Sequence, residues 1–180
     1  MKYLIVARHK ENVDWAYNLS GGWQPIIYHA GSSDHQPNST CGCEAFSYLQ
    51  EICRQWDMID DGDEVAFSQG DPFPHCTNFS VDIETKQYMG RLHSCGNCGL
   101  PHCTYLNLDA YCGTFDIPRS SPYWFSEGAH FKTTGAKIHS HPKSFYEALR
   151  QLVNTPHSRD PKHHAMTMER LWFNIFDIKP

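Results

Sequence analysis

Residues 3–29 decide the fold; they read YLIVARHKENVDWAYNLSGGWQPIIYH. The run Tyr3–Ala7 is short, apolar and rich in strand formers, which is typical of a strand covered on both faces. Apolar side chains then recur at loosely helical spacing over residues 11–19, and that segment ends at Gly21-Gly22. Residues 25–29 (PIIYH) predict the next strand. A strand, a helix and a strand with short connections predict two parallel strands joined through the helix.

The next segments repeat this alternation. Residues 44–57 place apolar side chains on one stripe and predict an amphipathic helix. An acidic turn at residues 60–63 stops that helix, and residues 64–68 (EVAFS) predict a third strand. The β-α-β-α-β order predicts an α/β fold, a compact Rossmann-like sheet flanked by helices.

The rest of the chain divides into an irregular middle and an ordered end. Residues 71–122 hold five prolines, four glycines and no long periodic segment, so we expect loops and short strands there. Residues 123–131 predict a strand interrupted at Gly128. Ser144 and Glu147 have the spacing of a capping box that opens a helix, and a last helix is expected over roughly residues 165–176.

Length and composition favour one domain over residues 1–180. Of the 180 residues, 40% are hydrophobic and 19% are charged, which is enough for one core and too apolar for disorder. No stretch reaches the ~20 apolar residues of a membrane helix, and the apolar start is too short for a signal peptide. We therefore expect a soluble, cytoplasmic protein with no membrane partner.

The net charge of −5 is unevenly distributed along the chain. Residues 1–130 hold 7 Lys and Arg against 16 Asp and Glu, whereas residues 131–180 hold 8 against 4. An acidic body does not resemble a general nucleic-acid binder, whose whole domain is usually basic. The basic end allows one local phosphate-binding face, or it is simply a solvated basic surface.

Four of the eight cysteines form a metal-like pattern, Cys95-x2-Cys98-x4-Cys103-x8-Cys112. In a chain without an export signal, such spacing favours metal binding over disulfides. Four thiolates suit a closed, tetrahedral zinc site, so we expect a structural zinc that staples an irregular, Cys-rich insertion at residues 77–120. Reduced, buried or partly paired cysteines are the alternative.

Polar residues follow the first and third predicted strands. Residues 8–11 (RHKE) come directly after the first strand and residues 68–72 (SQGDP) after the third. Ligands bind beyond the carboxyl ends of parallel strands, so an active site is expected at this edge. Asp71 and His75 offer oxygen and nitrogen ligands that suit Mn²⁺ or Mg²⁺ holding a diphosphate. Alternatively, Asp71 with Pro72 merely forms a turn.

Two carboxylates later in the chain are candidates for a general base. Glu127 stands beside Gly128, and Glu169 lies on the predicted last helix. The alternative for Glu169 is an ordinary exposed helix carboxylate.

Several segments together resemble one family. VARHKENVDW, GCEAFSYLQEI, VAFSQGDPFPH and GAHF…HPKSFYEAL…MERLWFNIF occur in the order found in an uncharacterised glycosyltransferase-like family of fungi, bacteria and viruses. The resemblance covers most of the chain outside about 77–120, and it implies a GT-A-type fold that binds a nucleotide sugar. One departure is that Asp71-Pro72-Phe73 stands where GT-A enzymes usually carry Asp-x-Asp. The resemblance implies substrate-binding roles for Arg8, Glu11, Glu44, Gln69, Gly70 and Arg170.

The activity implied is transfer of a sugar from a nucleotide-sugar donor to a hydroxyl acceptor. Asp71, with a divalent metal, and Arg8 would stabilise the leaving diphosphate, and Glu169 or Glu127 would deprotonate the acceptor. The acceptor is a saccharide or a hydroxymethylated base in DNA, the basic end then facing the DNA. Two other classes stay open: a non-catalytic, zinc-stapled module that binds nucleic acid or another ligand, and a metal-dependent phosphohydrolase built from Asp71, His75 and the C-terminal histidines.

Overall fold

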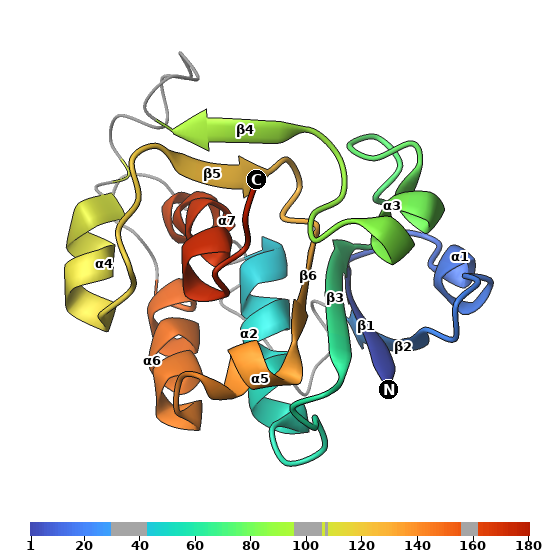
Figure 1. Ribbon diagram of the computed structural model, residues 1–180, viewed down its shortest axis with the longest axis horizontal. Helices are drawn as coiled ribbons and strands as arrows, with labels where there is room; N and C mark the ends of the chain where they lie inside the picture. The colour runs from blue at the N-terminus through green and yellow to red at the C-terminus, as the bar shows by residue number, and fades with distance from the viewer. Residues whose placement is uncertain (30–42, 96–105, 107, 156–161) are drawn as a thin grey trace.

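The computed structural model describes residues 1–29, 43–95, 106, 108–155 and 162–180. In it, a four-stranded sheet lies between helices on both faces, and a two-stranded sheet crosses one end (Figure 1). The elements follow in the order β1 (Lys2–Arg8), α1 (Asp14–Tyr17), β2 (Gln24–His29), α2 (Cys43–Gln55), β3 (Glu64–Gln69), α3 (Phe79–Thr85), β4 (Leu92–Cys95), α4 (Leu108–Phe115), β5 (Tyr123–Ser126), β6 (Phe131–Thr134), α5 (Gly135–His139), α6 (Lys143–Val153) and α7 (His163–Ile175).

The four-stranded sheet has the strand order β2-β1-β3-β6. β1 pairs in parallel with β2 and β3, and β6 runs antiparallel to β3. Leu4, Ile5 and Val6 at the centre of β1 are fully buried because helices cover both faces of the sheet. The expected α/β sheet with parallel strands and flanking helices is therefore confirmed.

The two connections that build the parallel strands lie on opposite faces of the sheet (Figure 1). α1 joins β1 to β2 and packs in one hydrophobic cluster, whereas α2 joins β2 to β3 and packs in the other. The chain therefore moves from β1 outward to β2 and then crosses back to β3 on the other side of β1, so the direction of the connections changes between β1 and β3. In sheets of this kind, the position beyond the carboxyl ends of those two strands is where ligands bind.

The larger hydrophobic cluster joins the main sheet to the last helix. The Phe67 ring on β3 stacks on Phe131 of β6, with centroids 4.8 Å apart. Trp172 and Phe176, within and just after α7, pack against Phe131. Burial of these large rings is a major source of stability, so α7 is part of the core.

The segment expected to form one strand with an interruption forms two strands in different sheets. β5 pairs with β4, and β6 pairs with β3. The break lies at Gly128, whose φ of +78° turns the chain from one sheet into the other. The interruption was predicted correctly, but the separation into two sheets was not.

Two local expectations were wrong. Helix α6 begins at Lys143 with Pro142 at the N-cap position and no side-chain cap, so Ser144 lies inside the helix. Helices α3 and α4 occupy part of residues 71–122, where loops and short strands were expected. No helix in the described ranges combines the length and apolar character that crossing a membrane requires.

Candidate functional site

The ends of β1 and β3 meet through Arg8, Glu11 and Gly70. The Nε of Arg8 donates to the Glu11 carbonyl at 2.8 Å, and its Nη1 lies 3.3 Å from Nδ1 of His29 at the end of β2. A Cβ placed on Gly70 would lie 2.6 Å from Oε2 of Glu11. Glycine at position 70 therefore lets the loop after β1 close onto the end of β3.

The Glu11 carboxylate is held by backbone groups. Its Oε2 accepts the N–H of His9 at 2.7 Å and that of Lys10 at 3.0 Å. Desolvation by itself would raise the pKa of Glu11, but hydrogen bonds from three backbone N–H groups outweigh it and lower the pKa. Glu11 is therefore an ionised carboxylate that fixes the loop carrying Arg8.

A second group, the carboxylate cluster, consists of Glu44, Gln69, Glu169 and Arg170. Glu44, in the first turn of α2, hydrogen-bonds with the side chain of Gln69 at the end of β3. Glu169 of α7 accepts the backbone N–H of Gly128 on Oε1 at 2.9 Å, and its Oε2 pairs with Arg170. Three segments far apart in sequence thus come together beside the end of β3.

The charge of Glu169 affects the protonation of Glu44. Burial raises the pKa of Glu44 to about 7, and the negative charge of Glu169 contributes in the same direction. The Gln69 hydrogen bond and the charge of Lys162 act in the opposite sense and do not reverse the shift. Glu44 therefore exchanges a proton near neutral pH, as a general acid or base requires.

Buried polar atoms beside the carboxylate cluster lack a partner within the described part of the chain. They are Oη of Tyr48, one helical turn after Glu44, and Nε of Arg170. Burial, followed by the charges of Glu44 and Glu169, raises the pKa of Tyr48. The Arg170 guanidinium lies over the Phe125 ring, 4.3 Å from its centroid. Buried polar atoms are normally hydrogen-bonded, so a polar ligand or water is expected beside them.

A third group, the histidine cluster, consists of His75, His93, Glu127 and His130. Glu127 lies between two imidazoles, with Oε1 at 3.4 Å from Nδ1 of His75 and Oε2 at 3.3 Å from Nε2 of His93. His130 is fully buried, and in the described residues neither ring nitrogen has a partner. Burial, with a smaller contribution from His75, lowers the pKa of His130 to about 3, so its ring is neutral at physiological pH.

Gly128 connects the carboxylate and histidine clusters. Its N–H holds Glu169, and a Cβ at its position would lie 2.6 Å from Nε2 of His130 and 3.0 Å from Cδ2 of His75. With a φ of +78° as well, this position accepts glycine alone without strain. The β5–β6 turn thus sets the spacing between Glu127 and Glu169.

Asp71 and His75 point to different partners. Oδ1 of Asp71 accepts the backbone N–H of Phe73 at 3.3 Å, the turn contact that was the alternative to metal binding. His75 contacts Glu127 instead. Across the described ranges, no three His, Cys, Asp or Glu side chains form a metal-binding group. These two residues do not fit a shared divalent cation in this arrangement, and a catalytic metal stays a prediction.

The four predicted zinc ligands are only partly described. Cys95 is disulfide-bonded. Cys112 is a buried free thiol on α4, 3.4 Å from the Tyr123 hydroxyl. Cys98 and Cys103 lie outside the described residues. The disulfide matches the alternative of partly paired cysteines, and the structural zinc stays a prediction.

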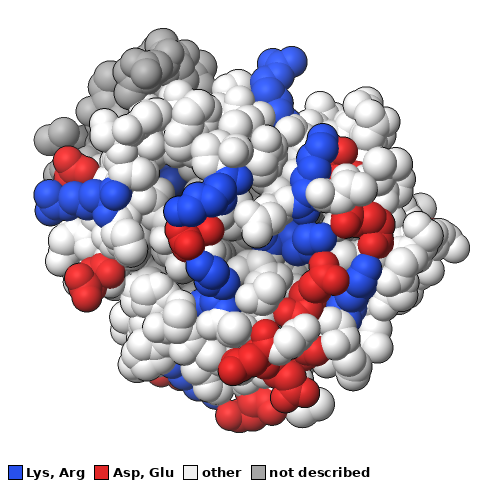
Figure 2. Space-filling view, viewed as in Figure 1, with Lys and Arg blue, Asp and Glu red and all other residues white. Residues whose placement is uncertain are grey.

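Most described cations of the C-terminal segment already have partners. Arg170 is buried and forms an ion pair with Glu169. Lys132 pairs with Glu64, and both Lys137 and Lys179 pair with Asp177. Figure 2 shows blue side chains dispersed on this face and acidic ones gathered over the turn between α2 and β3. Arg159 lies outside the described residues. This arrangement does not favour a continuous phosphate-binding face for DNA.

Three residues of the site were missed from sequence. Tyr48 lies four residues after Glu44 on the same helical stripe, a spacing that already placed it near that carboxylate. His93, two residues before the predicted zinc ligand Cys95, was not placed beside Glu127, and His130 received no role because its burial depends on β6 joining the main sheet.

Comparisons with protein-family models, curated proteins and solved structures give no match to this chain.

Proposed function

We propose that this protein is a glycosyltransferase that moves a sugar from a nucleotide-sugar donor to a hydroxyl acceptor. One observation carries the proposal: Glu44, Gln69 and Glu169, from three separate motifs of the resemblance, lie together at the carboxyl end of β3. The raised pKa of Glu44 gives this group a proton-transfer capacity near neutral pH.

The Glu44–Glu169 pair acts as the general base. The acceptor oxygen attacks the anomeric carbon of the sugar, and the bond between that carbon and the diphosphate oxygen breaks. The acceptor proton passes to Glu44, whose pKa is raised by burial and by the negative charge of Glu169. Gly128 and Arg170 hold Glu169 in place, so the accepting oxygens are positioned before the acceptor binds.

Arg8 acts on the leaving group and not on the acceptor. The leaving diphosphate gains negative charge as the bond breaks, and a guanidinium at the end of β1 stabilises that charge. Glu11 fixes the loop through His9 and Lys10 and accepts no proton itself. The exposed Phe73 ring, 5.7 Å from Trp15 by centroids, offers a flat surface next to Asp71 for a ring of the donor.

A saccharide is the preferred acceptor. Several of the cations that would hold a DNA backbone are paired with carboxylates on the described surface, among them Lys132 and Lys137. A neutral saccharide needs only hydrogen-bonding groups and one base, and the two clusters supply both.

The test is a transfer and hydrolysis assay on the full chain with a panel of nucleotide sugars. Glu44→Gln and Glu169→Gln should each lower kcat by about 10²-fold or more, since proton transfer by a positioned base contributes that much. Glu147→Gln, a change on helix α6 outside both clusters, is the matched control. If no nucleotide sugar binds or is consumed, or if Glu44→Gln keeps full activity, the proposal is wrong. Release of phosphate from nucleotides without transfer would favour the phosphohydrolase.

A further inference from the structure

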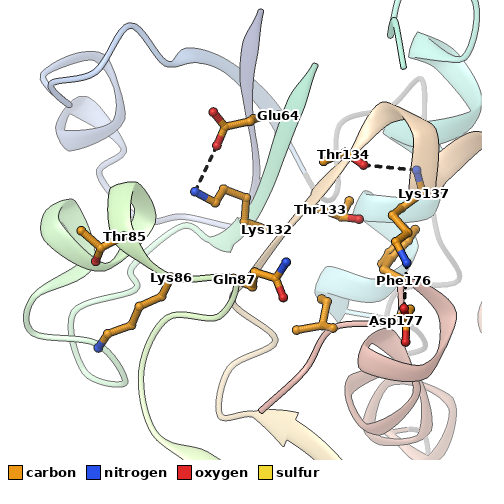
Figure 3. Close-up of a pocket in the computed structure, with 11 residues that line it drawn as sticks. Glu64, Thr85, Lys86, Gln87, Lys132, Thr133, Thr134, Lys137, Phe176 and Asp177 are labelled. Carbon is orange, nitrogen blue, oxygen red and sulfur yellow. Dashed lines mark hydrogen bonds and ion pairs between the residues drawn. The ribbon is translucent and has the colours of Figure 1, made fainter. Parts of the chain in front are cut away.

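We draw no further inference here: the strongest candidate, the pocket around the edge strand β6 (Figure 3), shows no common site for one ligand, because the ammonium groups of Lys86, Lys132 and Lys137 point apart, each to its own carboxylate.

Discussion

The backbone N–H of Gly128 donates a 2.9 Å hydrogen bond to Oε1 of Glu169. This contact joins the turn between β5 and β6 to the last helix, and it orients the carboxylate that faces Glu44. The preceding residue, Glu127, lies between His75 and His93. One tight turn therefore positions carboxylates from both clusters.

Gly128→Ala should destabilise the protein by about 1–3 kcal/mol, because the new Cβ needs an unfavourable φ and meets Nε2 of His130. The measurement is the free energy of unfolding in urea. Gly22→Ala is the control, since Gly22 has the same φ of +78° but nothing within 4 Å of its Cβ. Equal losses for both variants would mean that crowding around Gly128 contributes nothing.

Glu44→Gln should change how stability depends on pH. The folded pKa of about 7 lies above the usual value of 4.5, so wild-type stability falls as pH rises from 4.5 to 7. Glutamine cannot ionise, so the variant should lose this slope and become more stable relative to the wild type above pH 7, by about 3 kcal/mol. Thermal unfolding of both proteins across this range measures it. Parallel curves would show that Glu44 titrates normally.

His130→Leu should make the protein more resistant to acid. The folded pKa of about 3 lies below the usual 6.5, so the unfolded chain binds a proton that the fold excludes. Wild-type stability is therefore lost as pH falls from 6.5 towards 3, and the loss amounts to about 3 kcal/mol by pH 4. The variant should lack that part of the decline in urea unfolding at stepped pH. A His130 ring that titrates near 6.5 by NMR would contradict this expectation.

Gly70→Ala should displace the Glu11 carboxylate, because a Cβ at position 70 would lie 2.6 Å from Oε2 and 3.1 Å from Cβ of Glu11. The amides of His9 and Lys10 would lose their acceptor, and their NMR shifts should move towards solvent-exposed values. If the loop after β1 also binds the donor, donor affinity should fall about tenfold. The control is Gly62→Ala, because a Cβ at position 62 has open space around it. This variant should leave the amide shifts of His9 and Lys10 and the donor affinity unchanged.

The centre of the main sheet was predictable because β1 and β3 are buried on both faces. Burial on both sides requires continuous apolar runs, and Tyr3–Ala7 is such a run. Helices α3 and α4 were not predictable from periodicity, since with 7 and 8 residues they are too short to repeat a stripe. The capping box failed because Pro142 already has the extended backbone of an N-cap, so the helix begins one residue before Ser144.

The candidate site was predictable where it depends on strand ends and not where it depends on topology. Arg8 and Gly70 follow from the rule that parallel strands end at one edge. His130 and Glu127 owe their surroundings to the division of one apolar segment between two sheets, which no local pattern encodes. Asp71 and His75 are close in sequence, but the turn at Asp71 uses its carboxylate locally and His75 turns towards Glu127.

The pairing of β6 with β3 has a consequence for the order of folding during synthesis. β1, β2 and β3 lie within the first 69 residues and can pair early, whereas β6 begins at residue 131 and α7 at residue 163. Contacts between such distant segments form late, because closing long loops costs chain entropy first. Glu169 reaches Glu44 only once the last helix has docked, so a nascent chain has a partial sheet but not yet the paired carboxylates.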